Sequence, residues 1–315
     1  MRNDDALTAD EVAGLLQVSR SSVYKLVKAD ELASYHVGRK MRFTMGDVEN
    51  YIARSKRSRP PLQAASAASL FAMPRGRASS PPAAAYVLAG NDIVGDILAN
   101  YLGATNTAVD RIYEGSYNAL VDLYRGEVHA ALTHLYDGET DSYNVAAVKR
   151  LLPGVPLKVV RLVRRRQGLI VAKGNPKNLR TWDDLLQPGV RLVNRECGCG
   201  SRILLDEQLA RRGVSGAAIE GYEREANSAL SMASFVARGA ADVGIGAERV
   251  FHQVEGVGFL PLQDEWLDIV LAKRPGCERA VDAIAKLART RPFREEVGSI
   301  VGYDASRMGE VVFER

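Results

Sequence analysis

The stretch LTADEVAGLLQVSRSSVYKLVKADELASYHVGRKMRFTMGDVENYI, residues 7–52, carries the boundary signals of three short helices and one hairpin. Thr8 with Glu11 three residues later forms a capping box, which predicts a helix starting there. Ser19 is placed to cap a second helix over residues 20–29. Strand-like runs at 34–37 and 41–44 then predict a hairpin, and Thr44 or Met45 is expected to open a third helix.

The second predicted helix and the hairpin are basic on their outward faces. Helix side chains that can donate hydrogen bonds to phosphates and to base edges in a major groove are Arg20, Ser21, Ser22, Tyr24, Lys25 and Lys28. The basic residues of the hairpin, suited to the adjacent DNA backbone, are Arg39, Lys40 and Arg42. The alternative is a solvated face of a small protein-binding domain, but basic residues on both elements favour DNA.

Over residues 7–52 this order of helix, turn, helix, hairpin and helix resembles the excisionase-like winged helix-turn-helix family. The resemblance implies a small α+β domain that binds double-stranded DNA. It places the recognition surface on Arg20, Ser21, Ser22, Tyr24 and Lys25, and the wing on Arg39, Lys40 and Arg42.

Charge and composition divide the chain into parts. Residues 1–77 carry 13 Lys/Arg against 8 Asp/Glu, whereas residues 78–315 carry 29 against 30, so the excess positive charge lies near the predicted DNA-binding segment. A Pro/Ala/Ser-rich stretch predicts a flexible linker. We therefore expect a multidomain protein with a DNA-binding domain at 1–55, a linker at 56–85 and a ligand-binding domain at 86–315.

The location follows from what the sequence lacks. It contains no apolar run of about 18 residues, and its first residues are acidic rather than basic and then apolar. We expect a cytoplasmic protein that does not associate with a membrane.

From residue 86 onward, short apolar runs alternate with helical stretches, which predicts an α/β domain with mostly parallel strands. Strands are expected at 86–90, 130–133, 169–172, 190–193 and 242–245. In such sheets ligands lie beyond the carboxyl ends of the strands. Polar or glycine-bearing loops at 90–92, 114–118, 194–202 and 225–228 precede predicted helices at 94–102, 119–125, 203–211 and 229–237. Backbone amides at such helix starts can hold an anion or a small polar molecule.

Four segments resemble the periplasmic-binding-protein-like (type 2) family: GSYNALVDLYRGEVHAALTHLYDGETDSYN, RRQGLIVAKGNPKNLRTWDDLL, VRLVNRECGCGSRILLDEQL and VARGAADVGIGAE. The resemblance implies two α/β lobes that close over a ligand, with hinges near 168–172 and 259–268. The ligand-binding residues that it implies are Asn91, Asp92, Ser116, Thr133, His134, Arg195, Gly198, Cys199, Ser201, Arg202, Asn227 and Ser228. The effectors that it implies are molybdate or tungstate, another oxyanion, or a small pterin-like or carboxylate metabolite.

One loop departs from the family pattern. Where the family commonly has Gly-Ser-Gly-Thr-Arg, this chain has Gly-Cys-Gly-Ser-Arg at 198–202, so the thiol of Cys199 replaces a hydroxyl. A small packing residue is favoured over a ligand-tuning or redox role. The three cysteines, at 197, 199 and 277, are too sparse for a disulfide framework or a zinc site, so we expect neither a metal nor a cofactor. Of the arginines at 164–166, two are expected to lie at a strand end without projecting into the ligand-binding cleft.

These parts predict a one-component, ligand-responsive transcriptional regulator that works as a homodimer or higher homo-oligomer, because one helix-turn-helix reads few base pairs. We expect no enzymatic activity, since no nucleophile elbow, phosphate loop, dinucleotide fingerprint or His-Glu-x-x-His is present. Two alternatives remain open. One is an enzyme or carrier of molybdenum-cofactor metabolism, and the other is an excisionase-like architectural DNA protein.

Overall fold

The computed structural model describes residues 86–105 and 107–315, and parts of the N-terminal segment: 7–9, 11–12, 23, 27, 32–37, 40–44 and 47. The chain divides into two units, Met1–Pro74 and Arg75–Arg315.

The N-terminal unit contains the expected capping box and hairpin. The backbone N–H of Thr8 donates to Glu11 Oε2 at 2.7 Å, and the N–H of Glu11 donates back to Thr8 Oγ1 at 3.3 Å. Strands β1 (Tyr35–Val37) and β2 (Lys40–Arg42) pair antiparallel. A second capping box, in which the N–H of Thr44 donates to Asp47 Oδ2 at 2.8 Å, lies where the third helix was expected, and Asp47 itself is helical.

A small core lies under these elements. Val12, Val23 and Phe43 are fully buried, and the backbones of Leu7 and Phe43 form a bridge. Of the predicted DNA-contacting residues, Lys40 and Arg42 lie on β2. The others, Arg20, Ser21, Ser22, Tyr24, Lys25, Lys28 and Arg39, lie outside the described residues, as does the predicted linker up to residue 85.

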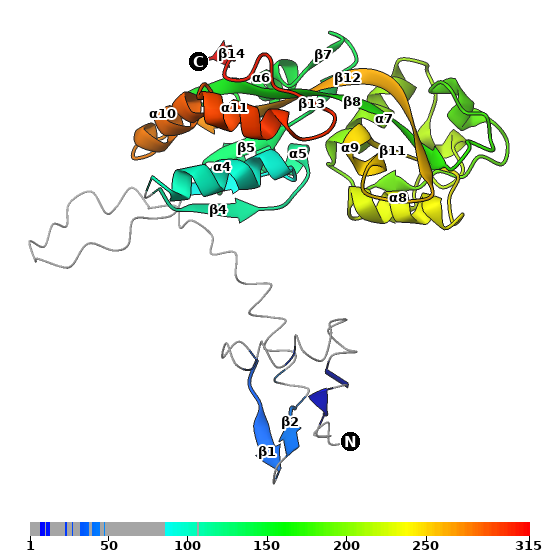
Figure 1. Cartoon of the computed structure of the whole chain (residues 1–315), viewed down its shortest axis with the longest axis horizontal. Helices are drawn as coiled ribbons and strands as arrows, with labels where there is room; N and C mark the ends of the chain where they lie inside the picture. The colour runs from blue at the N-terminus through cyan, green and yellow to red at the C-terminus, as the bar shows by residue number, and fades with distance from the viewer. Residues whose placement is uncertain are drawn as a thin grey trace, which may run out of the picture. The chain divides into compact units, whose positions relative to one another are not determined.

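The C-terminal unit is two α/β lobes joined by two long strands, β8 (Leu157–Ala172) and β12 (Val257–Ala272), which pair antiparallel along their length (Figure 1). The first lobe contains β3 (Tyr86–Ala89), α4 (Ile93–Gly103), β4 (Val109–Ile112), α5 (Ser116–Arg125), β5 (Ala130–Thr133), α6 (Val145–Leu151), α10 (Glu278–Leu287), α11 (Arg291–Gly298), β13 (Tyr303–Asp304) and β14 (Val311–Glu314). The second lobe contains β9 (Asn194–Arg195), α7 (Gly200–Ala210), β10 (Glu225–Ala226), α8 (Ala229–Ala237), β11 (Val243–Ala247) and α9 (Glu248–Phe251).

The main sheet has the order β11-β8-β12-β5-β3-β4, and only its β5-β3-β4 part is parallel. The expectation of mostly parallel strands is therefore wrong. The reason is that β8 and β12 cross between the lobes in opposite directions, so each pairs antiparallel with its neighbours. The segments predicted as hinges, near 168–172 and 259–268, lie within these two strands.

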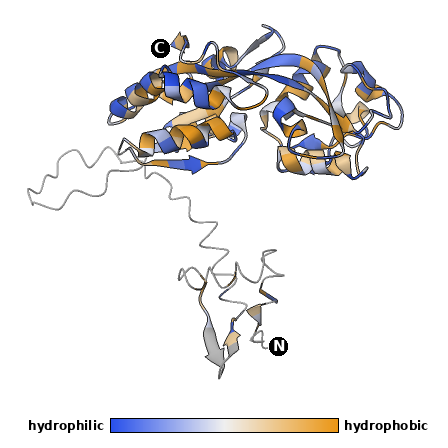
Figure 2. Cartoon of the chain, in the orientation of Figure 1, coloured by the Kyte–Doolittle hydropathy of each residue, from blue (hydrophilic) through white to orange (hydrophobic). Residues whose placement is uncertain are grey.

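The spacing of buried residues along a helix shows which of its faces packs on the sheet. Helix α4 buries Val94, Leu98 and Leu102, a one-face spacing that covers the sheet of the first lobe. Figure 2 shows α4 and α8 as largely hydrophobic, while α10 and α11 carry many hydrophilic residues. A short hairpin of β6 (Tyr136–Asp137) and β7 (Ser142–Tyr143) packs its tyrosines with Leu204 and Leu205 of α7, which links the two lobes.

Predicted boundaries differ from the observed ones mainly at helix starts. Helix α8 has the predicted bounds, but α5 begins at Ser116 and α7 at Gly200, three residues earlier than expected in each case. The expected strand at 190–193 is reduced to a single bridge between Leu192 and Val243. As a result, Ser116 and Ser201 belong to the first turns of helices rather than to the loops before them.

Candidate functional site

A cavity of about 220 Å³ lies between the two lobes of the C-terminal unit. Its walls come from the loops before α4 and α5, the ends of β5 and β11, the middle of β8, and the starts of α7 and α8. The volume is below the roughly 300–1,000 Å³ typical of drug-sized sites, which favours a compact ligand.

Two helices point uncapped first turns at this cavity. Helix α5 follows Gly115 and α7 follows Cys199, and neither N-cap residue makes a side-chain capping hydrogen bond. The first N–H groups of a helix have no acceptor within the helix, and the helix dipole adds partial positive charge there. Gly115, Ser116, Cys199 and Ser201 all line the cavity, so both helix starts can contribute donors to a bound molecule.

The same two helix starts touch each other across the lobes. The N–H of Tyr117 donates to the carbonyl oxygen of Gly198 at 3.1 Å. Gly198 has φ +84°, and a Cβ atom on Gly115 would come within 2.5 Å of the Gly198 oxygen. Glycine at both positions therefore permits this close approach.

The other two predicted helix starts are capped by their own side chains. Asp92 Oδ1 accepts from the N–H of Val94 at 2.9 Å, and Ser228 Oγ accepts from the N–H of Ser231 at 3.0 Å. Of the four amide-rich loops expected from the sequence, two thus leave their helix starts without a side-chain cap.

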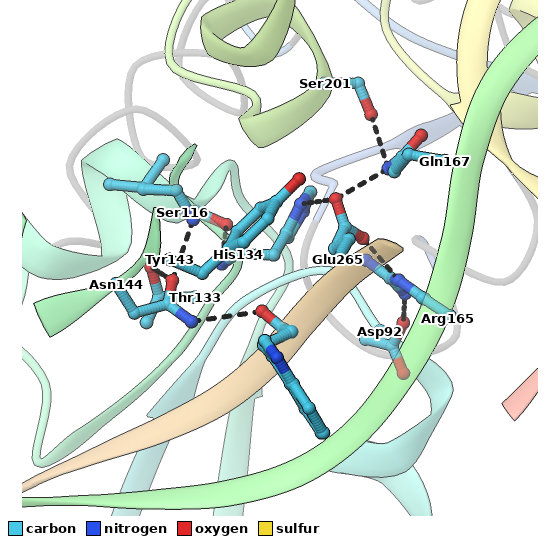
Figure 3. Close-up of polar contacts among 12 residues, drawn as sticks. Asp92, Ser116, Thr133, His134, Tyr143, Asn144, Arg165, Gln167, Ser201 and Glu265 are labelled. Atoms are coloured by element: carbon cyan, nitrogen blue, oxygen red, sulfur yellow. Dashed lines mark hydrogen bonds and ion pairs between the residues drawn. The ribbon is translucent and has the colours of Figure 1, made fainter. Parts of the chain in front are cut away.

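A buried charge network forms the floor of the site (Figure 3). Arg165 of β8 donates from Nε to Glu265 Oε1 at 2.5 Å and also pairs through Nη1 with Asp92. Glu265 Oε2 lies 3.0 Å from Nδ1 of His134 and accepts from Gln167 Nε2 at 2.8 Å. Glu265 is fully buried, so these contacts replace the water that a carboxylate would otherwise need.

The electrostatics of this network keep Glu265 ionised. Burial by itself raises the pKa of Glu265, but the charges of Arg165 and His134 and their hydrogen bonds outweigh it and lower the pKa from 4.5 to about 2. Burial raises the pKa of Tyr303, whose hydroxyl donates to Asp92 at 2.8 Å. The linking strands therefore hold a carboxylate that stays charged well below neutral pH.

Lowering the pH should reduce the stability of the folded state, because this carboxylate becomes protonated. Because the pKa of Glu265 is lower in the folded state, its stabilising contribution is complete above about pH 4.5 and is lost as the pH falls towards 2. We expect the difference in melting temperature between wild type and Glu265→Gln to narrow over that range. Thermal scans at several pH values measure it, and a constant difference would contradict the assignment.

A second buried network explains Thr133, which was predicted to contact ligand. Its hydroxyl donates to Asn144 Oδ1 at 3.2 Å, and Asn144 Nδ2 donates to Asp268 Oδ2 at 2.8 Å. Thr133 is fully buried and does not line the cavity. Its hydroxyl thus helps to hold β5 and β12 together.

The structure brings most of the predicted site residues to the cavity. Those that line it are Asn91, Asp92, Ser116, His134, Arg195, Cys199, Ser201 and Ser228. Those that do not are Thr133, Gly198, Arg202 and Asn227. Gly198 uses its carbonyl in the contact between lobes, Arg202 stacks over Tyr222 with 4.2 Å between its Cζ and the ring centroid, and Asn227 is exposed.

Some cavity residues were not predicted from the sequence, notably Gln167, Arg249 and Gln253. Among the three successive arginines, Arg165 is buried in the cavity wall while Arg164 and Arg166 are exposed, in agreement with the expectation that two of them decorate the strand. The alternation of β8 places Arg165 and Gln167 on one face, a signal that could have identified Gln167.

Arg249 is the one cavity arginine without a partner within the described part of the chain. Arg165 is paired with Glu265 and Asp92, and Arg195 with Glu196 at 2.7 Å. No hydrogen bond or ion pair of the Arg249 guanidinium occurs with the residues that the structure describes. Its charge therefore remains for an anion in the cavity.

The Cys199 thiol is a poor nucleophile here. Burial raises the pKa of Cys199, although Arg195 nearby acts in the opposite direction. The side chain is 5% exposed, which favours the packing role expected from the sequence. No group of three or more potential metal-ligating side chains occurs within residues 86–105 and 107–315 or the described N-terminal positions.

Two lobes that enclose a polar cavity define a periplasmic-binding-protein-like ligand-binding domain, here in one chain with a helix-turn-helix. A model described as the PBP superfamily domain matches residues 99–289, and a helix-turn-helix domain model of the excisionase-like kind matches residues 6–56. The chain belongs to the PBP superfamily, and both predicted resemblances are confirmed. Neither model describes an enzyme. None of the helices in the described residues has the length and apolar character needed for a membrane span.

The chain is similar over its full length to a bacterial protein. It is 38% identical over 317 residues to the uncharacterized protein YvgK of Bacillus subtilis (strain 168), covering 100% of both chains. Among solved structures it is similar to EhuB in complex with hydroxyectoine, with TM-score 0.51 and 16% identity over 71% of this chain and 92% of that one. A Clostridium perfringens protein with bound phosphate gives TM-score 0.50 and 13% identity over 71% and 98%. These likenesses support the fold.

Proposed function

We propose that this protein is a DNA-binding transcriptional regulator whose C-terminal lobes close on a small anionic or polar effector. The proposed organisation is a DNA-binding domain at 1–55, a linker at 56–85 and a ligand-binding domain at 86–315. The observation that carries the proposal is the cavity, where the α5 and α7 starts and the uncommitted Arg249 guanidinium face one compact volume. Backbone N–H groups at two helix starts, together with the guanidinium of Arg249, can bind a small anion.

Closure supplies the coupling to DNA. An effector held by both lobes binds the closed state better than an open one, and only this differential affinity can shift the equilibrium. Through the linker, the shift would alter how two DNA-binding domains of a homodimer meet repeated half-sites. A coupling factor of about 5–150 in DNA affinity is typical of such systems.

The effector candidates are molybdate or tungstate, another oxyanion such as phosphate, or a small carboxylate metabolite. The cavity volume supports a compact molecule, and the Clostridium perfringens neighbour with bound phosphate is an example of an oxyanion in this fold. Two alternatives remain. DNA-binding measurements test the first, an enzyme or carrier of molybdenum-cofactor metabolism, and the cavity experiments test the second, an architectural DNA protein.

Arg20→Ala combined with Lys25→Ala should weaken binding to the chain's own promoter fragment by at least about tenfold, because both residues are predicted to contact DNA. The salt dependence of binding should also become shallower. Fluorescence anisotropy at two salt concentrations measures both effects. The matched control is Arg291→Ala, which removes an exposed cation of α11 and should leave DNA affinity unchanged. Unaltered affinity of the double variant would place DNA recognition elsewhere, and no salt-dependent binding at all would favour the enzyme or carrier.

A further inference from the structure

Gln167 offers a hydrogen-bond acceptor that nothing in the described part of the protein uses. Its side chain lines the cavity and is 1% exposed. The amide nitrogen is occupied, because Nε2 donates to Glu265 Oε2 at 2.8 Å and to Ser201 Oγ at 3.2 Å (Figure 3). The amide oxygen Oε1 is buried and has no hydrogen-bond partner among the described residues.

Glu265 fixes which way the Gln167 amide points. Despite its burial, Glu265 remains ionised because Arg165 and His134 hold its pKa at about 2. A turned amide would put Oε1 within hydrogen-bond distance of this carboxylate, where two acceptors repel. The orientation with Nε2 towards Glu265 is therefore the stable one, and Oε1 is left as the unsatisfied atom.

Within the described residues, no neighbouring group of this network donates to Oε1. Glu265 is an ionised carboxylate that only accepts, from Arg165 at one oxygen and from Gln167 at the other. Arg165 is committed to Glu265 and Asp92. A ligand that displaces water from this acceptor and offers no donor in its place binds more weakly, by a factor of about ten or more, than a ligand that supplies the donor.

Other walls of the same cavity require hydrogen-bond acceptors, not donors, from a ligand. Arg249 and the uncapped starts of α5 and α7 provide donors and positive charge, which suit acceptor oxygens. A ligand that satisfies all of these groups needs anionic oxygens and, on the same small molecule, an N–H or O–H.

We infer that the cavity selects a compact anion that also carries a hydrogen-bond donor, as in hydrogen phosphate or an α-hydroxy acid, and discriminates against anions made only of acceptor oxygens, such as sulfate and molybdate. The inference rests on the proposed function and narrows its effector class. Gln167 is the residue that sets this specificity.

The test compares matched probes on the full chain, freed of bound small molecules by unfolding and refolding. Phosphate is set against sulfate and molybdate, and lactate against propionate, because the members of each set are anions of similar size and differ chiefly in the donor. Calorimetric titration at neutral pH should give at least about tenfold tighter binding of the donor-bearing member in one set or both. Sulfate, molybdate or propionate binding equally tightly would overturn the inference and leave the proposed function standing. Binding of none of the five would overturn the small-anion class on which the proposed function depends.

A variant tests the residue itself. Gln167→Met keeps the length of the side chain and removes the acceptor, so the affinity ratio within the discriminating set should fall towards one. Gln187→Met, at an exposed position outside the cavity, is the control and should keep the wild-type ratio. A ratio unchanged in Gln167→Met would overturn the role of Gln167, whatever the absolute affinities of the variant.

Discussion

Replacing Glu265 by glutamine is expected to lower the free energy of unfolding of the C-terminal unit by about 3–5 kcal/mol. The variant leaves the Arg165 guanidinium buried with one carboxylate partner, Asp92, instead of two. A buried charge that loses one of its carboxylate partners is no longer fully compensated, and this destabilises the folded state. Both tryptophans of the chain, Trp182 and Trp266, lie in this unit, so denaturant unfolding followed by tryptophan fluorescence reports on it.

The control for this measurement is Glu295→Gln. Glu295 pairs with Arg291 at 2.6 Å on α11, but both side chains are exposed, so we expect a change of at most about 1 kcal/mol. If Glu265→Gln lowered the free energy of unfolding as little as the control does, the buried network would not hold the linking strands together.

Filling the cavity should separate effector sensing from DNA binding. Ser201 lines the cavity at the start of α7 and is 5% exposed, so tryptophan in its place would occupy the volume that the effector needs. For wild type we expect promoter affinity to differ by a factor of about 5–150 between protein with its bound small molecule and protein freed of it. Ser201→Trp should bind the promoter with one unchanging affinity, because the residues predicted to bind DNA lie in the other unit.

Ser306→Trp provides the matched control, since Ser306 is exposed and does not line the cavity. It should respond to removal of the bound molecule as wild type does. A response retained in Ser201→Trp would move the effector site away from this cavity, whereas loss of DNA binding in that variant would show that the substitution damages more than the cavity.

Local signals in the sequence predicted the N-terminal hairpin and the bounds of α8, but α5 and α7 begin three residues earlier than expected, and α6, α10 and α11 were not predicted. The capping box of Thr8 and Glu11 and the start of α8 after Ser228 were found correctly, because a cap depends on residues three or four positions apart. The antiparallel β8–β12 ladder was missed because it joins residues about 100 positions apart, and no local pattern encodes that pairing.

The same distinction applies to the site. Residues at helix starts, such as Ser116 and Ser201, were predicted from their neighbours and do line the cavity. Glu265 and Gln167 were missed because their importance comes from each other, across β8 and β12, and from the buried Arg165. Thr133 was misplaced because a strand-end hydroxyl can face either the ligand or a buried partner, and here it faces Asn144.

Native mass spectrometry of the full chain, purified from its own host as wild type and as Ser201→Trp, tests the central claim most directly. If the lobes enclose a compact effector, the wild-type protein carries an added small mass that is absent from the variant, and that mass identifies the effector. Equal masses for the two proteins after correction for the substitution, or an added mass that the variant retains, would contradict the account.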